Sequence, residues 1–213
     1  MTLQRVLPFT KSLLAQTVQK GDTVIDATAG NGHDTHFLAT LTGDAGKVYA
    51  FDIQQQAIDA TRERVKEFQH VELIKDSHAK ITDYVTSAIS AAVFNLGYLP
   101  KGDHSIITKA QSTLAAISQC LELLKENGLL LIVIYSGHDG GSEERDGVMQ
   151  YVQALPQVSY QSDTVLAVCF QRNLLPRTRI LHGSASRILL LHRSSFLPYM
   201  DIRNNVHLPR SMS

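Results

Sequence analysis

The sequence predicts an α/β fold, a mainly parallel sheet with helices on both faces. Two observations indicate this fold. Short apolar segments rich in β-branched residues alternate along the chain with longer segments of helical periodicity. In addition, residues 23–41 combine a strand, a glycine turn and a helix, which is the first half of a nucleotide-binding βαβ unit.

Length and charge suggest one domain with a distinct end. A chain of 213 residues is long enough for one α/β domain, which we expect over residues 1–193, followed by a flexible Arg-containing tail over 194–213. The 20 basic and 20 acidic residues balance, but residues 171–213 hold seven arginines and one acid, Asp201. Such a basic end fits either a polyanionic partner or a solvated tail.

Cysteine usage and apolar run length predict a cytoplasmic protein. Cys120 and Cys169 lie in apolar segments without motif spacing, so we expect both to be reduced core residues. No apolar run reaches the roughly 18 residues of a membrane span, and the N-terminus lacks the pattern of a signal peptide. We therefore expect no membrane partner; a homodimer is left open.

The first elements frame a glycine turn. Thr10 would cap a helix over residues 11–20 that covers one edge of the sheet, and residues 23–27 would form a buried strand. Gly30 and Gly32 allow a positive φ and close approach of a ligand to the backbone before the helix over residues 33–41. Thr35 stands where a dinucleotide fingerprint has its third glycine. The alternative is an ordinary turn that contains two glycines.

The second strand, predicted over residues 47–53, contains an acid close to its end. Asp52 lies 20 residues after Gly32, the spacing at which nucleotide-binding folds place a carboxylate that accepts hydrogen bonds from ribose hydroxyls. Gln54 would reach the same nucleoside. The alternative is a surface aspartate that caps the next helix, expected over residues 55–68.

The third strand, expected over residues 71–74, is followed by polar residues. Carboxyl ends of parallel strands share one edge of the sheet, so Asp76, Ser77 and His78 should lie beside Asp52 and could read the edge of an adenine. An N-cap by Asp76 or Ser77 is the structural alternative, and both roles are compatible. A helix is expected over residues 81–89.

The fourth strand, over residues 91–94, leads into Asn95-Leu96-Gly97-Tyr98-Leu99-Pro100. The Asn95 oxygen and a turn carbonyl can accept the N–H hydrogens of an amine and so aim its lone pair. Tyr98 can stack on the ring that carries this amine. The alternative is an ordinary asparagine in a turn after a strand.

The remaining elements complete the sheet. We expect a helix over residues 108–126, a central strand over 129–134, a helix over 146–155 and a strand over 163–170. Residues 187–191 would add an antiparallel strand at the edge. In the glycine-containing loop after residue 134, His138 could accept a proton, bind RNA or simply be exposed.

Five motifs together resemble one family. They are Asp-Ala-Thr-Ala-Gly-Asn-Gly-His-Asp-Thr at 26–35, Ala-Phe-Asp-Ile-Gln at 50–54, Asp-Ser-His at 76–78, Phe-Asn-Leu-Gly-Tyr-Leu-Pro at 94–100 and Tyr-x-Gly-His-x-Gly-Gly at 135–141. The first is similar to motif I of class I methyltransferases that use S-adenosyl-L-methionine (SAM), and the set resembles the MnmM/YtqB-like methyltransferases. After Phe170 the chain departs from the family pattern.

The resemblance implies a Rossmann-like enzyme that methylates the aminomethyl nitrogen of 5-aminomethyl-2-thiouridine at the tRNA wobble position. Carried over by position, Gly30, Asn31, Gly32 and Asp34 would lie near the methionine end of SAM, and Asp26 would also be a cofactor-binding residue. Asp52 and Gln54 would bind the ribose, and Ser77 and His78 would lie at the adenine. Asn95 and Tyr98 would face the target base, with His138 or Asp34 helping to remove a proton.

Three other functions stay open on the sequence alone. The acidic body before residue 171 suits a small-molecule N-methyltransferase better than an RNA enzyme. His33, Asp34 and His36, with His138 and Asp139, could serve a metal-dependent hydrolase. However, we expect His36 to face away from the crevice, so we predict no metal. The last alternative is a SAM-binding protein without activity.

Overall fold

A computed structural model describes residues 6–97, 99, 107–135, 141–155, 165–170, 180–181 and 187–192. The expected tail over residues 194–213 lies outside these residues, and so do Tyr98 and His138. None of the helices in the described part of the chain is both long enough and apolar enough to cross a membrane.

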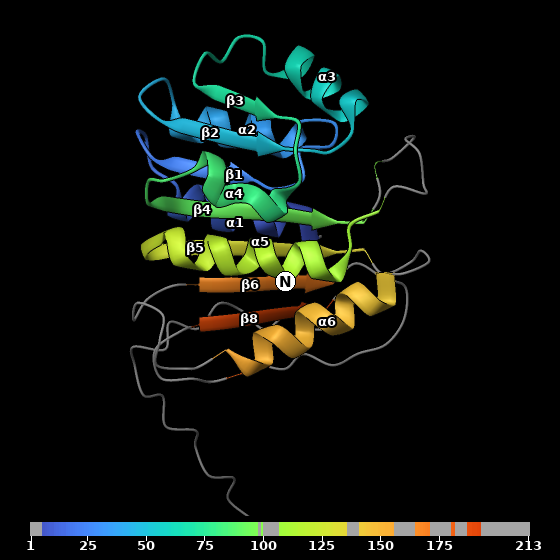
Figure 1. The fold of residues 1–213 in the computed structure, drawn as a ribbon. Helices are drawn as coiled ribbons and strands as arrows, with labels where there is room; N and C mark the ends of the chain where they lie inside the picture. Colours follow the sequence, from blue (N-terminus) through green and yellow to red (C-terminus); the bar gives the residue numbers. More distant parts are fainter. Residues whose placement is uncertain are drawn as a thin grey trace, which may run out of the picture.

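The described strands form one eight-stranded sheet, in the order β3-β2-β1-β4-β5-β6-β8-β7 (Figure 1). All neighbouring strands are parallel except β7 and β8, so the predicted α/β class with a mainly parallel sheet is confirmed. The strands are β1 (Thr23–Asp26), β2 (Lys47–Phe51), β3 (Val71–Ile74), β4 (Ile89–Leu96), β5 (Leu124–Ile134), β6 (Val165–Phe170), β7 (Ile180–Leu181) and β8 (Arg187–His192).

Helices cover both faces of the sheet, as expected. In Figure 1, α5 and α6 lie in front of the sheet, and α1 and α2 lie behind it. Each face has its own apolar core, with Ile117 and Val148 in one and Leu14 and Leu38 in the other. The helices are α1 (Val6–Thr17), α2 (His33–Thr42), α3 (Gln55–Arg64), α4 (Ile81–Tyr84), α5 (Ala110–Leu123) and α6 (Gly141–Ala154), with a 3₁₀ turn, η1, at His78–Lys80.

The central strands are continuous apolar runs because both of their faces are covered. In β4 every residue except Asn95 is buried, and the β5 residues from Gly128 to Ile134 are buried as well. A parallel strand covered on both faces needs such a run rather than an alternating pattern. Asn95 therefore stands out as the one residue of this strand that is not fully buried.

Several predicted helix bounds are wrong. The first helix begins at Val6, and the Thr10 hydroxyl bonds the Leu7 carbonyl inside it instead of capping it. This helix packs on β4 and β5 rather than covering an edge of the sheet. The helix expected over 81–89 ends at Tyr84, and the helix expected from residue 146 begins at Gly141.

The end of the sheet differs from the prediction. The strand expected over residues 187–191 as an antiparallel edge pairs parallel with β6 as β8, and the short β7 is its antiparallel neighbour. The apolar run was identified correctly. Its direction was wrong, because strand direction depends on the connection that precedes it.

The strand order reverses between β1 and β4. From β1 the chain builds outward through β2 and β3, whereas from β4 it builds through β5 and β6 on the other side. In open α/β sheets, the crevice at the carboxyl ends of the strands on either side of such a reversal is where ligands bind. The segments after β1 and β4 therefore meet at the expected binding position.

Candidate functional site

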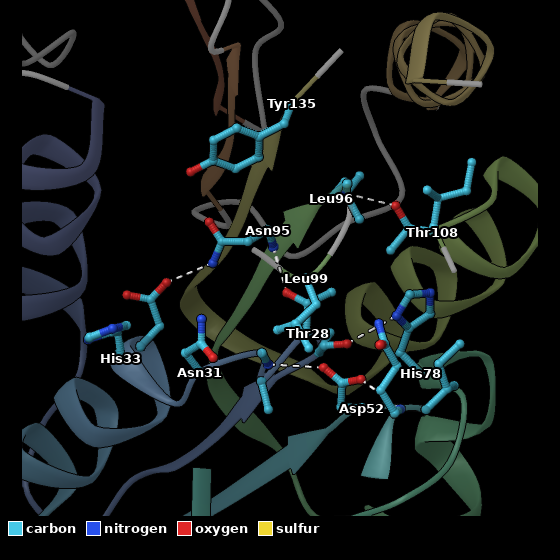
Figure 2. A pocket seen from close by; sticks show the side chains of 18 of the residues that line it. Thr28, Asn31, His33, Asp52, His78, Asn95, Leu96, Leu99, Thr108 and Tyr135 are labelled. Carbon is cyan, nitrogen blue, oxygen red and sulfur yellow. Dashed lines mark hydrogen bonds between the residues drawn. The ribbon is translucent and has the colours of Figure 1, made fainter. Parts of the chain in front are cut away.

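One pocket of about 970 Å³ opens where this crevice is expected (Figure 2). Its walls come from α1, from the turns after β1, β2, β3, β4 and β5, and from the segment before α5. This volume lies in the range of small-molecule and cofactor sites. The residues expected from the sequence that line it are Gly30, Asn31, Asp34, Asp52, Gln54, Asp76, Ser77, His78 and Asn95.

Asp26 lies beneath the pocket and is not one of its lining residues. Its carboxyl group accepts a hydrogen bond from the Thr35 hydroxyl at 2.6 Å and another from the Thr28 backbone N–H at 3.2 Å. Burial, followed by the nearby charge of Asp34, raises the pKa of Asp26 to about 7. Asp26 therefore organises the glycine turn from below.

The two predicted glycines have different roles. Gly30, with φ 54°, lines the pocket, whereas Gly32, with φ 75°, packs against α3. A Cβ at Gly32 would lie 2.9 Å from the Thr61 Cα. Gly32 thus permits the close packing of α2 on α3, and it is not among the residues that line the pocket.

Asp52 follows β2 and joins two of the turns. Its Oδ2 accepts the Gly30 N–H at 3.0 Å, and its Oδ1 accepts the Gln54 N–H at 2.9 Å. Burial raises the pKa of this carboxyl group. Each carboxylate oxygen can accept a further bond, so Asp52 can still take two hydroxyl donors from a ligand.

Ser77 and His78 line the pocket after β3. The Ser77 hydroxyl accepts the Ala79 N–H at 3.2 Å, so Ser77 is also the N-cap of the η1 turn, as the structural alternative predicted. His78 Nδ1 lies 3.0 Å from the Ala27 carbonyl oxygen, which makes Nδ1 the protonated nitrogen. Burial lowers the pKa of His78, and the neutral imidazole is the form that suits this site.

Asn95 is held from two directions. Its backbone N–H donates to the Thr28 Oγ1 at 2.7 Å, and its side-chain Nδ2 donates to Asp34 Oδ2 at 2.7 Å. Because an ionised carboxylate only accepts hydrogen bonds, Asp34 fixes which end of the Asn95 amide is nitrogen. Figure 2 shows the Asn95 oxygen on the side of the amide that faces Tyr135.

Several lining residues were not among the sequence predictions. Lys11 of α1 is the one Lys or Arg among the described lining residues, and Thr28, Thr108 and Tyr135 also line the pocket. Thr28 and Tyr135 lie inside the motifs quoted above, so the neighbouring residues of those motifs could have pointed to them. No sequence pattern around Lys11 indicates a binding role, because α1 reaches the pocket only through tertiary packing.

Among the histidine and carboxylate candidates for a metal that the structure describes, His33 and Asp34 line the pocket and His36 does not. His36 packs edge-on against Phe68 at 5.2 Å and lies 3.5 Å from a Glu67 oxygen, away from the pocket-lining residues. Within the described ranges, no three His, Cys, Asp or Glu side chains group as metal ligands do. His138 and Asp139 fall outside those ranges.

Comparisons with known proteins identify similar methyltransferases. The model of the family described as "Putative rRNA methylase" matches residues 48–178. A tRNA (mnm(5)s(2)U34)-methyltransferase, chloroplastic, from Arabidopsis thaliana is 42% identical over 154 residues. The match covers 66% of this chain and 56% of that protein, so the chain spans little more than half the length of this curated relative.

Solved structures agree with this result. A putative rRNA methylase from Clostridium thermocellum is 42% identical, with a TM-score of 0.72 over 74% of this chain and 86% of that one. A putative methyltransferase from Streptococcus mutans, crystallised in complex with SAH, is 43% identical, with a TM-score of 0.66 over 73% and 85%. A SAM-dependent O-methyltransferase from Thermotoga maritima, 18% identical with a TM-score of 0.51 over 73% and 52%, shares the fold alone.

Proposed function

This chain belongs to the putative rRNA methylase family, and we propose that it is a SAM-dependent N-methyltransferase. Its proposed target is the aminomethyl group of 5-aminomethyl-2-thiouridine at the wobble position of tRNA. One observation carries the proposal: Asn95, at the switch point of the sheet, is anchored by Asp34 so that its amide oxygen is left to accept an N–H.

The pocket residues fit SAM. Asp52 keeps acceptor capacity for the two ribose hydroxyls, and Gln54, Ser77 and His78 lie beside it for the nucleoside. Gly30, Asn31 and Asp34 would lie at the methionine end, with Asp26 and Gly32 supporting their turn from outside the pocket. When bound, SAM supplies an electrophilic methyl group. The Streptococcus mutans relative holds SAH, the demethylated form of SAM.

Lys11 supplies the positive charge that this set would otherwise lack. It lines the pocket, and its Nζ lies 5.1 Å from the centroid of the Phe37 ring. The pKa of His33 is lowered by burial, by the charge of Arg64 and, to a smaller extent, by the charge of Lys11, so Lys11 lies close to His33. A lysine in such a position suits the carboxylate of the methionine end. We assign Lys11 to that carboxylate.

Asn95 and Asp34 would align the acceptor amine. A neutral amine donates an N–H to the Asn95 Oδ1, and this bond directs the nitrogen lone pair toward the methyl carbon. The proton that leaves the amine goes to solvent or to a nearby base, for which His138 and Asp34 remain the predicted candidates. Tyr98 remains predicted to stack on the target ring, and Tyr135 borders the same part of the pocket.

A tRNA acceptor is favoured over rRNA by the name of the Arabidopsis relative, which is 42% identical. The experiment uses purified protein and SAM with a labelled methyl group. Its acceptors are tRNA that carries the wobble aminomethyl group without the methyl, total rRNA, and the free 5-aminomethyl-2-thiouridine nucleoside.

The proposal expects label in tRNA, located at the wobble uridine by nuclease digestion and mass spectrometry. Label in rRNA alone, or no transfer to any acceptor, would overturn it. Equal transfer to tRNA and to the free nucleoside would favour the small-molecule alternative. The proposal includes a cytoplasmic location, and sedimentation of the purified protein tests for a homodimer.

A further inference from the structure

A series of hydrogen bonds links helix α6 to the turn that follows Asn95. Glu144, in the first turn of α6, is buried with 2% of its surface exposed. Its Oε2 accepts the Thr108 hydroxyl at 2.6 Å, and its Oε1 accepts the Thr113 hydroxyl at 2.7 Å. The Thr108 Oγ1 in turn accepts the Gly97 backbone N–H at 2.9 Å.

Thr108 forms hydrogen bonds with both backbone polar groups of Gly97, the N–H and the carbonyl. Besides the bond to its hydroxyl, the Thr108 N–H donates to the Gly97 carbonyl at 3.1 Å. Gly97 has φ 150°, a conformation that L side chains seldom adopt. On the other side of the turn, the Leu96 carbonyl accepts the Tyr135 N–H at 3.0 Å. The backbone next to Asn95 is therefore fixed from two sides.

The side chain of Glu144 joins two segments of the chain. Within the described residues, its two oxygens accept hydrogen bonds from two hydroxyls, those of Thr108 and Thr113. A buried carboxyl group needs such partners, and both of these partners hold it in one orientation. Of the two hydroxyls, only that of Thr108 is also bonded to the Gly97 turn.

We propose that Glu144 and Thr108 are positioning residues for methyl transfer, acting through Gly97 on the orientation of Asn95. This inference rests on the proposed function. Glu144 orients the Thr108 hydroxyl by accepting its hydrogen, so the hydroxyl oxygen faces the Gly97 N–H. Small displacements of a group that aligns reactants can lower a rate by about 100-fold, so a loosened turn should act on turnover.

The chain offers a matched pair of variants. Thr108→Val and Thr113→Val each remove one hydroxyl bonded to Glu144 and keep the side-chain shape, but only Thr108 contacts Gly97. Thr113 is fully buried and does not line the pocket. Steady-state methyl transfer to tRNA, SAM affinity by calorimetry and thermal unfolding are measured for both variants, for Thr108→Ser and for Glu144→Gln.

We expect Thr108→Val to lower kcat by about 10-fold or more, with the Kd for SAM changed by less than about threefold. Thr108→Ser should restore most of the rate because it restores the hydroxyl. Glu144→Gln should lower kcat in the same direction. Thr113→Val should keep kcat within about twofold of the parental value even where its unfolding temperature falls as far as that of Thr108→Val.

Equal kcat losses in the two valine variants, or losses that follow unfolding temperature alone, would overturn the inference. So would a failure of serine to rescue. An inactive parental protein would instead contradict the proposed function, and the two failures are thus distinguishable.

Discussion

Asp26 illustrates at the scale of one residue how a motif position can serve a site without touching a ligand. Its carboxyl group holds Thr28 and Thr35. Thr28 in turn accepts the Asn95 backbone N–H, so the turn after β1 is tied to the end of β4 through one hydroxyl. The spacing of Asp26 from Gly30 suggested cofactor contact, whereas its burial assigns it to the support of the turn.

The buried Asp26 should make stability depend on pH. Its pKa rises from 3.8 in the unfolded chain to about 7 in the folded protein, so the folded state prefers the protonated form. The contribution of Asp26 to the free energy of unfolding is fully present below about pH 4 and is lost as the pH rises through about 7. The loss amounts to about 4 kcal/mol. The asparagine in Asp26→Asn cannot ionise, so the free energy of unfolding of this variant should decrease less as the pH rises.

Urea unfolding between pH 5 and pH 8 checks this expectation, with exposed Asp83→Asn as the control for a lost charge. The parental midpoint should fall relative to that of Asp26→Asn as pH rises. Parallel curves for the two proteins would refute the assignment.

Lys11 gives a second prediction at this scale. If it pairs with the carboxylate of the methionine end, Lys11→Ala should raise the KM for SAM about 10-fold, the usual order for a bond between charged groups, and leave kcat near the parental value. Lys11→Arg should recover part of the affinity, and exposed Lys20→Ala should have no effect. A kcat loss at unchanged KM would exclude the proposed pairing.

Residues that follow strand ends were predictable, and those brought in by packing were not. Asp52, Ser77, His78 and Asn95 line the pocket as expected, because parallel strands deliver their carboxyl ends to one rim. Lys11 was missed because α1 lies on β4 and β5, a contact that no local pattern encodes. Gly32 lies outside the pocket because its neighbour is Thr61 of α3.

At the scale of elements, strand positions were predicted better than helix ends. Buried strands are marked by apolar runs, so β1 to β5 were found within a few residues, although β5 begins five residues early. There Asn127 has φ 62°, and the β4–β5 pairing shifts register between Ile89 and Ala91. Such an irregularity arises from pairing between strands, which the periodicity of one segment does not contain.

The packing of α2 on α3 can be tested with two glycines. Gly32 and Gly21 both have positive φ, but a Cβ at Gly21 has no atom within 4 Å, whereas one at Gly32 meets the Thr61 backbone. Gly21→Ala should cost about 1 kcal/mol of unfolding free energy, from the backbone conformation alone. Gly32→Ala should cost about 3 kcal/mol.

Chemical denaturation of the two variants measures this difference. Equal losses would mean that α3 moves aside at little cost. In that case Gly32 would not be required for the contact between the two helices.

At the scale of the whole molecule, charge separates an acidic body from an Arg-containing end. If that end contacts tRNA phosphates, replacing Arg203 and Arg210 by glutamine should weaken tRNA binding. With both arginines on phosphates, the slope of log affinity against log salt should become shallower by about 1.5 to 2. Replacing Arg62 and Lys66, exposed residues paired with Asp59 and Glu63, removes the same charge and should leave the slope unchanged.

Binding measured at several salt concentrations decides between the two interpretations of this segment. A shallower slope for the Arg203 and Arg210 variant supports contact with a polyanion. An unchanged slope identifies a solvated tail.

The central claim joins all three scales: a switch-point pocket brings a methyl donor and an amine together, and the Asn95 amide aligns them. The most direct measurement is mass spectrometry of the tRNA wobble nucleoside from cells that lack this protein and receive either the parental gene or Asn95→Ala. The account predicts that the parental gene restores the methylated nucleoside and that the variant leaves the unmethylated aminomethyl form. Full methylation with Asn95→Ala, or an unaltered wobble nucleoside in cells without the protein, would contradict it.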